Sequence, residues 1–270
     1  MRTAPFRGVA PPTRRYGEPT DNIPDRAASQ WKMAAGRDNR TSTPSRFAAL
    51  ATDYDGTIAT EGRVPAGVLD VLRDLRRSGR ALLLVTGRIR SELEEVFPDV
   101  DLFSRIVLEN GAVLFHPETG EEKLLAARPP EAFFQRLKNL GVMPLVRGRV
   151  VVATRQPYET TVQEVIRDLG LSLHVEFNRN SVMVLPLGVT KATGLDAALR
   201  ELSLSPSDVV GVGDAENDRS FLEQCGTSVG VANALPSVKE RVDWVTRASE
   251  GAGVVEAVRR LLSDDKEMQS

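Results

Sequence analysis

The sequence has almost no cysteine or histidine, and this excludes several kinds of site. Cys225 is the one cysteine in 270 residues, so no disulfide can form within the chain, and we expect a reducing, cytoplasmic location. We interpret Cys225 as a small buried residue rather than as a nucleophile. The two histidines, His116 and His174, are far apart in the sequence, which argues against a histidine-based metal site.

Long apolar runs and an excess of charge are also absent. No apolar run approaches the roughly 18 residues of a membrane-spanning helix, so we expect no membrane partner. The formal net charge of −2 gives no electrostatic reason to expect nucleic acid as a partner. With 41% hydrophobic residues, a chain of 270 residues can form one large α/β domain, or a core domain with a smaller insert.

Residues 1–45 differ from the rest of the chain. They are rich in Arg, Pro, Ser, Thr and Asn and show no apolar periodicity, so they cannot bury enough surface to offset the entropy lost on ordering. They lack the apolar segment of a secretory signal, and their acidic residues argue against an arginine-rich transit peptide. We predict a disordered N-terminal tail, or the product of an over-long start site.

From residue 47 onward, short apolar runs alternate with amphipathic segments. Strands are predicted at 47–52, 81–85, 106–108 and 208–212, with helices at 65–77 and 191–202 among the segments between them. Strands that alternate with helices predict an α/β fold with a Rossmann-like parallel sheet and right-handed crossovers. We assign residues 46–111 and 189–265 to this core domain.

The pattern changes between residues 112 and 188. Helices are predicted at 131–140 and 161–169, and strands at 149–154, 173–178 and 181–186. The last two strands are predicted to pair through a turn at Arg179 and Asn180. We therefore predict a small α+β cap domain at 112–188, inserted into the core, with hinges near 110–111 and 187–188.

Two acids follow the first predicted strand. Asp53 and Asp55 lie where open α/β sheets bind ligands, and Gly56 permits a sharp turn after them. One carboxylate could attack phosphorus, while the other could protonate the leaving oxygen and later activate water. Taken alone, however, an Asp-x-Asp-Gly sequence is usually a solvated turn.

Three further groups of residues could complete a phosphate site. Thr86 and Gly87 end the second strand, where a hydroxyl and an amide can hold a phosphoryl oxygen. Lys191 opens a predicted helix and could neutralise a phosphoryl group and an attacking carboxylate together. Asp214, Glu216 and Asp218 repel one another unless a cation offsets them, and together with Asp53 they suit Mg²⁺. Each group alone could equally be an ordinary turn, a surface lysine or a solvated acidic loop.

The order of these features resembles the haloacid dehalogenase-like (HAD) hydrolase superfamily over residues 48–262. The matching motifs, in order, are Asp53-x-Asp55-Gly56-Thr57, Thr86-Gly87-Arg88, Lys191 and Gly213-Asp214-x-x-Asn217-Asp218. Glu109-Asn110-Gly111 and residues 230–234 are similar to the Cof-type, or type IIB, branch, whose cap lies where 112–188 falls. The insert is nearer in size to the caps of archaeal phosphoglycolate phosphatases and sucrose-phosphate phosphatases than to those of Cof proteins.

The resemblance implies a Mg²⁺-dependent phosphatase that acts on a small phosphorylated metabolite, either a sugar phosphate or a phosphoglycolate-like monoester. It implies that Asp53 is the nucleophile and a metal ligand, and that Asp55 is the acid/base and offers its backbone carbonyl to the metal. The remaining implied roles are phosphate binding by Thr86, Gly87, Lys191 and Asn217, metal binding by Asp214, and support by Asp218.

Other functions stay open at this point. A phosphomutase can use the same core, and a non-catalytic regulatory protein could have kept the fold, although no catalytic acid is missing. Arg147, Arg149 and Arg179 are the cap residues that we expect to face an anionic substrate, with a solvated surface position as the alternative for each. Neither the substrate nor the oligomeric state follows from the sequence.

Overall fold

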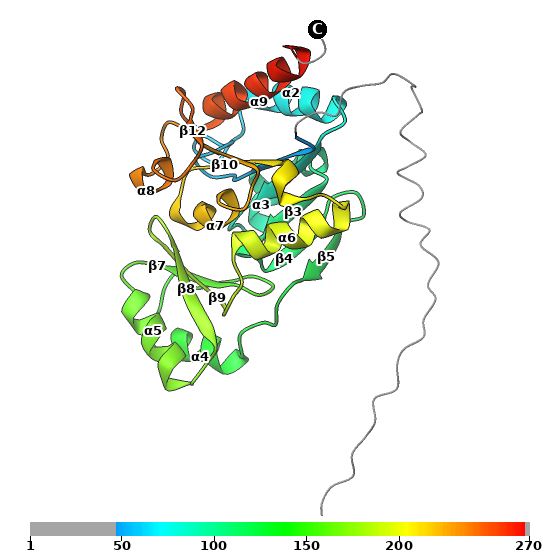
Figure 1. Cartoon of the computed structure of the whole chain (residues 1–270). Helices are drawn as coiled ribbons and strands as arrows, with labels where there is room; N and C mark the ends of the chain where they lie inside the picture. The colour runs from blue at the N-terminus through cyan, green and yellow to red at the C-terminus, as the bar shows by residue number, and fades with distance from the viewer. Residues whose placement is uncertain (1–46, 268–270) are drawn as a thin grey trace, which may run out of the picture. The chain divides into compact units, whose positions relative to one another are not determined.

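The computed structural model describes residues 47–267 (Figure 1). The predicted tail lies outside the described residues. The core contains an eight-stranded sheet in the order β12-β11-β10-β1-β2-β3-β4-β5. Its strands are β1 (Ala49–Thr52), β2 (Ala81–Val85), β3 (Arg105–Leu108), β4 (Val113–His116), β5 (Glu121–Leu124), β10 (Val209–Gly213), β11 (Thr227–Gly230) and β12 (Trp244–Val245). Strands β1 to β3 and β10 to β12 are parallel, whereas β4 and β5 are antiparallel additions at one edge.

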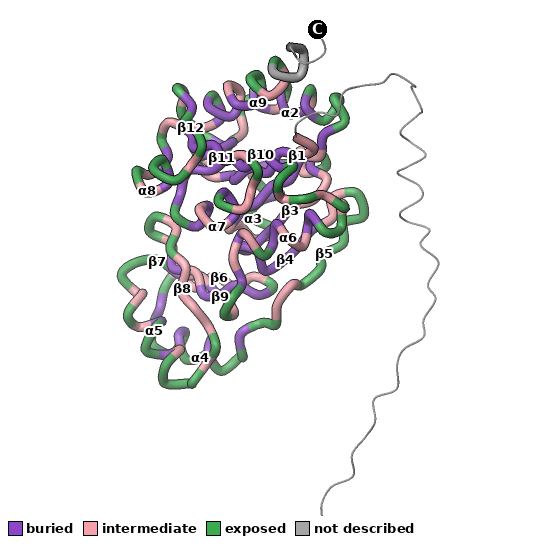
Figure 2. The backbone as a smooth tube through the Cα atoms, viewed as in Figure 1, coloured by how far each residue is buried: buried purple, intermediate pink, exposed green. Residues whose placement is uncertain are grey.

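Helices cover both faces of this sheet. The core helices are α2 (Ala66–Arg77), α3 (Arg90–Val96), α6 (Lys191–Leu202), α7 (Arg219–Leu222), α8 (Pro236–Lys239) and α9 (Glu250–Glu267), with 3-10 turns η1 (Val100–Leu102), η2 (Glu109–Gly111), η3 (Pro206–Asp208) and η4 (Glu216–Asp218). In Figure 1, α2 and α9 lie on one side of the sheet and α6 and α7 on the other. Val68, Leu72 and Leu75 are spaced so that they lie on one face of α2, and all three side chains are buried. Figure 2 shows the burial concentrated in the central strands.

A second, antiparallel sheet forms the cap. Its order is β6-β7-β9-β8, and its elements are β6 (Val146–Arg147), β7 (Val152–Arg155), β8 (Leu173–Asn178), β9 (Ser181–Pro186), α4 (Glu131–Asn139) and α5 (Glu159–Asp168). It has a hydrophobic cluster of its own, in which Phe133 and Val162 of the helices meet Val182 and Val184 of β9. The predicted hairpin that turns at 179–180 is confirmed, because Asn178 pairs with Ser181.

The segment from residue 112 to 125 belongs to the large sheet. Strands β4 and β5 fall inside the range 112–188, yet β4 pairs with β3. The residue types of β4 are mostly apolar, as in any buried strand, so they do not predict which of the two sheets it joins. We therefore propose that the cap begins after β5. A Cβ on Gly111 would collide with the Thr190 carbonyl, so the two predicted hinge regions approach each other closely.

The strand order creates a switch point beside β1. The chain runs from β1 to β2 on one side, and the later strand β10 lies on the other side. The backbone N–H of Asp53 donates to the carbonyl of Val212 at 3.0 Å, which brings together the chain segments that leave β1 and β10. Open α/β sheets bind ligands at such a point, beyond the carboxyl ends of the strands. Within residues 47–267, no helix is long and apolar enough to cross a membrane.

Candidate active site

Three aspartates meet beyond the carboxyl ends of β1 and β10. Asp53 follows β1, Asp214 follows β10, and Asp218 ends η4. All three are buried, and one carboxylate oxygen from each lies within 4.8 Å of the others. Residues separated by about 160 positions in the sequence therefore form one acidic centre, as the switch point predicts.

Lys191 lies between two of these acids. It begins α6, whose N-terminus is capped by Thr190, because the Thr190 hydroxyl accepts from the N–H of Thr193 at 3.3 Å. The fully buried Lys191 Nζ lies 2.5 Å from Asp53 Oδ1 and 2.6 Å from Asp218 Oδ1. Burial alone would lower the pKa of Lys191, but the two carboxylates raise the pKa on balance, so the ammonium stays charged.

Burial and mutual repulsion raise the pKa values of two of these acids. Burial raises the pKa of Asp53 well above its ordinary value, the charge of Asp218 raises it further, and Lys191 opposes both effects. Burial and Asp218 also raise the pKa of Asp214. The ionised forms that phosphate chemistry needs are thus disfavoured, and an additional cation would stabilise them.

The donor set fits a divalent cation. Both carboxylate oxygens of Asp218 are engaged, since Oδ1 accepts from Lys191 while Oδ2 accepts from the backbone N–H groups of Asp214 and Ala215 at 2.9 Å. Asp53 Oδ2 has no hydrogen-bond partner among the described residues. Asp214 also uses both oxygens, since Oδ1 accepts from Thr57 Oγ1 at 3.2 Å and Oδ2 accepts from Arg179 Nη2 at 3.0 Å. A divalent cation would therefore bind first to Asp53 Oδ2, with the neighbouring carboxylates of Asp214 and Asp218 completing the buried acidic group.

Known proteins with related sequences point to the same hydrolase family as the motifs around this acidic centre. The family model for haloacid dehalogenase-like hydrolases matches residues 50–142 and 132–258. The chain belongs to this family. A phosphoglycolate phosphatase from Methanothermobacter thermautotrophicus is 31% identical over 222 residues, which cover 79% of this chain and 98% of that enzyme. Another, from Haloarcula marismortui, is 31% identical over 227 residues, which cover 77% and 95%.

Solved structures show the same fold as this HAD-like hydrolase. A HAD/COF-like hydrolase from Plasmodium vivax aligns with a TM-score of 0.69 at 19% identity, covering 82% of this chain and 97% of that one. A HAD subclass IIB sugar phosphatase aligns with a TM-score of 0.64 at 20% identity, covering 78% and 98%. The predicted Rossmann-like core with a small α+β cap is confirmed, and so is the resemblance to the HAD-like hydrolases.

The second acid of the first motif has a different environment. The Asp55 side chain is 37% exposed. Arg88 donates two hydrogen bonds to its carboxylate, from Nε to Oδ2 at 2.8 Å and from Nη2 to Oδ1 at 2.7 Å. Such a two-pronged contact fixes the orientation of a carboxylate. In the sequence, Arg88 belongs to the Thr86-Gly87-Arg88 motif but has no predicted role, and in the structure it is the residue that positions Asp55.

The other predicted phosphate-binding residues lie around the same centre. The Thr86 hydroxyl oxygen accepts from the backbone N–H of Arg88 at 3.2 Å, which shapes the turn after β2. Asn217 is buried, and its Nδ2 donates to Asn110 Oδ1 at 3.0 Å. Its Oδ1 is buried and has no hydrogen-bond partner among the described residues. The contact with Asn110 ties η4 to η2.

Of the three predicted cap arginines, one reaches the acidic centre. Arg179, at the tip of the β8–β9 hairpin, places Nη2 3.0 Å from Asp214 Oδ2. Arg147 instead pairs with Glu131 at 2.6 Å, and Arg149 pairs with Glu122 at 3.1 Å. Arg147 and Arg149 are engaged in these ion pairs away from the site, which does not support the expectation that they face an anionic substrate.

Glu109 is a core residue that holds the cap. Its carboxylate is buried and accepts the backbone N–H groups of Arg149, Val150 and Val151 at 2.7, 2.8 and 2.8 Å. In the sequence Glu109 belongs to a family motif, but this role could not be predicted from it, because the partners of Glu109 are backbone groups 40 to 42 positions away.

Replacing Glu109 with alanine should loosen the cap from the core. Hydrogen bonds to a charged group contribute about 1.5–3 kcal/mol each, so losing three should cost about 4 kcal/mol or more in stability. Hydrogen exchange at Arg149, Val150 and Val151 should accelerate, while exchange in β1 stays slow. The control is Glu118→Ala, at an exposed turn residue. Unchanged exchange in the Glu109 variant would contradict this role.

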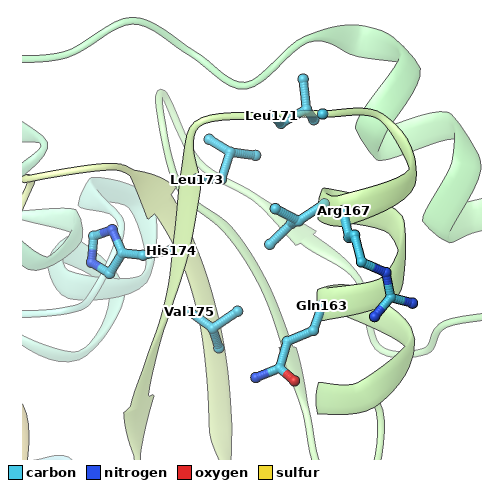
Figure 3. Close-up of a pocket in the computed structure, with 8 residues that line it drawn as sticks. Gln163, Arg167, Leu171, Leu173, His174 and Val175 are labelled. Carbon is cyan, nitrogen blue, oxygen red and sulfur yellow. The ribbon is translucent and has the colours of Figure 1, made fainter.

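A separate pocket lies within the cap, between α5 and β8 (Figure 3). Its volume is about 280 Å³, and its lining includes Gln163, Arg167, Leu171 and Val175. It shares no lining residue with the acidic centre. We assign no role in the chemistry to it.

Proposed function

We propose that the chain is a Mg²⁺-dependent phosphatase that hydrolyses small phosphate monoesters through an aspartyl-phosphate at Asp53. The observation that carries this proposal is the contrast between the two acids of the first motif. Asp53 is buried against Lys191, as a nucleophile held close to a cation would be. Asp55 is partly exposed and oriented by Arg88, as an acid/base in contact with water would be.

The chemistry divides into two steps. First, a carboxylate oxygen of Asp53 forms a bond to phosphorus as the bond to the leaving oxygen breaks, and Asp55 protonates that oxygen. Then Asp55 takes a proton from water, the water oxygen bonds to phosphorus, and the bond to Asp53 breaks to release phosphate. Lys191 offsets the charge on Asp53 and on the phosphoryl oxygens throughout. Mg²⁺, held by Asp53 and Asp214, would supply further positive charge to the phosphoryl oxygens.

We propose that the substrate is a small metabolite and that the protein is cytoplasmic. The cap that Glu109 holds over the site favours a small metabolite, and both relatives described above are phosphoglycolate phosphatases. Burial raises the pKa of Cys225 to about 12, which keeps the thiol protonated and unreactive. We propose a cytoplasmic location because a single cysteine can form no disulfide within the chain. We propose no nucleic acid or membrane partner, given the net charge of −2.

The test is phosphate release from a panel of phosphorylated sugars, phosphoglycolate and nucleotides, with and without Mg²⁺. We expect Mg²⁺-dependent release from at least one small monoester and slow turnover of p-nitrophenyl phosphate. Transfer of the phosphoryl group to another position of the substrate, without net release, would identify a mutase instead. No turnover of any ester with Mg²⁺ present would contradict the proposal.

Arg179→Ala should change the ratios of kcat/KM between substrates. Its guanidinium enters the site from the cap, so it can bind a second anionic group on the substrate, and a charge-assisted hydrogen bond is worth about 1.5–3 kcal/mol, or roughly tenfold to a hundredfold. Carboxylated substrates should lose most, and p-nitrophenyl phosphate least. Arg149→Ala, which breaks only the pair with Glu122, is the matched control. A uniform collapse of every activity in a folded variant would place a catalytic group in the cap.

A further inference from the structure

The cap strand β8 has two distinct faces. Val175 packs into the hydrophobic cluster of the cap. Since side chains alternate along a strand, His174, Glu176 and Asn178 face the opposite way. In Figure 3 the side chain of His174 lies on the side of β8 away from α5. Glu176 therefore belongs to the face of the cap sheet that is turned away from the cap helices.

That face covers the turn after β2, which carries the predicted phosphate-binding residues Thr86 and Gly87. Glu176 pairs across the sheet with Met183 of β9, so the two side chains are neighbours on one face. Met183 Sδ accepts from Asn110 Nδ2 at 2.8 Å, and a Cβ on Gly87 would stand 2.9 Å from Met183 Cε. The same sheet face that carries Glu176 thus closes over the turn that begins with Thr86.

Glu176 is also close to the acidic centre. Strand β8 packs against η4, which carries Asn217 and Asp218. Burial raises the pKa of Glu176 to about 7, and the charges of Lys191 and Asp218 both influence it, in opposite directions. Glu176 thus lies near the residues proposed to hold the phosphoryl group.

A buried oxygen of Glu176 lacks a partner. Its Oε2 is inaccessible to solvent and has no hydrogen bond with any described residue. A buried polar atom without a partner costs about 1–3 kcal/mol, so native structures keep few of them unless a ligand or water completes the bond. Asn217 Oδ1, in the neighbouring turn, is a second buried acceptor without a partner. Both atoms accept hydrogen bonds, so the complementary ligand is one that donates them.

A hydroxyl group is the ligand group that fits best. It can donate and accept, so it pairs with Glu176 in either protonation state, whereas an alkyl group pairs in neither. We propose that Glu176 is a specificity-determining residue that binds a hydroxyl of the leaving group, so that phosphorylated polyols and sugars are preferred over esters without a hydroxyl. Phosphoglycolate, which has no hydroxyl, would leave Glu176 unpaired. This inference rests on the proposed phosphatase function and narrows its substrate class.

The test compares glycerol 1-phosphate with propyl phosphate, two esters that differ only in hydroxyl groups. In the wild-type protein with Mg²⁺, we expect kcat/KM to favour glycerol 1-phosphate by at least about tenfold, the value of one hydrogen bond to a charged group. Glu176→Ala should bring this ratio close to one. Glu176→Gln, which keeps an acceptor oxygen, should retain part of it. Glu164→Ala, at an exposed residue of α5, should leave the ratio as in the wild type.

The outcomes separate this inference from the function on which it rests. If the wild-type protein hydrolyses neither ester nor p-nitrophenyl phosphate, the phosphatase proposal fails. If it hydrolyses both esters with equal kcat/KM, or if both Glu176 variants keep the full preference while remaining folded by circular dichroism, the role of Glu176 is refuted and the phosphatase proposal stands. If Glu176→Ala does not fold, the test uses the kcat/KM ratio of the two esters in the wild type and in Glu176→Gln. A wild-type preference that falls in Glu176→Gln supports the role of Glu176, and an unchanged ratio refutes it.

Discussion

Asp53→Asn should abolish phosphate release, lowering kcat by at least about a thousandfold, because the neutral amide cannot attack phosphorus. The fold should survive, since the asparagine oxygen can still accept from Lys191. Burial and Asp218 raise the pKa of Asp53, which disfavours its ionised form, while the same carboxylate stabilises the charged Lys191. The variant should therefore still show a cooperative melt, which separates loss of chemistry from loss of the fold.

The measurement is steady-state phosphate release together with a thermal melt with and without Mg²⁺. Asp168→Asn is the matched control, because it makes the same chemical change at an exposed residue at the end of α5. Activity of Asp53→Asn within about tenfold of the wild type, less than 1.4 kcal/mol of lost transition-state stabilisation, would rule out covalent catalysis by this residue.

The second large effect is expected for Asp55→Asn, and its size should depend on the leaving group. General acid–base catalysis contributes about 10²–10⁴-fold, so hydrolysis of a sugar phosphate should slow by that factor. The first step with p-nitrophenyl phosphate should suffer less, because p-nitrophenolate needs little protonation. Arg88 should stay in place, since an asparagine oxygen can still accept one of its two hydrogen bonds.

The comparison needs kcat/KM for both esters, since this parameter reports the step in which the leaving group departs. Arg88→Lys offers a graded companion variant, because a lysine cannot reproduce the two-pronged contact with Asp55. It should show the same dependence on leaving group with a smaller loss. Equal losses of kcat/KM on the two esters in Asp55→Asn would show that Asp55 has a structural role instead.

The acidic centre could be predicted because its residues directly follow predicted strands or begin a predicted helix. Asp53 and Asp214 each follow a short apolar run, and such runs predict buried parallel strands whose carboxyl ends share one edge. Lys191 opens a helix at the point where the core pattern resumes. The local pattern alone placed these residues near one another, while the family resemblance supplied their proposed roles.

The contacts between cap and core could not be predicted, since they depend on how two folded units meet. Glu176 occupies an ordinary polar position of an alternating strand, and nothing in the residue types shows that β8 packs against η4. Glu109 binds backbone groups, which leave no trace in the residue types. Arg147 and Arg179 look equivalent in the sequence, but only the latter lies on a hairpin that reaches Asp214.

The central claim is that phosphoryl transfer passes through Asp53, and trapping the intermediate tests it most directly. In Asp55→Asn the activation of water is impaired, so the phosphorylated form should accumulate with p-nitrophenyl phosphate and Mg²⁺. We expect a burst of p-nitrophenol equal to the enzyme concentration and, after acid quenching and proteolysis, a peptide carrying one phosphoryl group at Asp53. A linear release of p-nitrophenol with no phosphorylated peptide, or a phosphoryl group on another residue, would contradict the account.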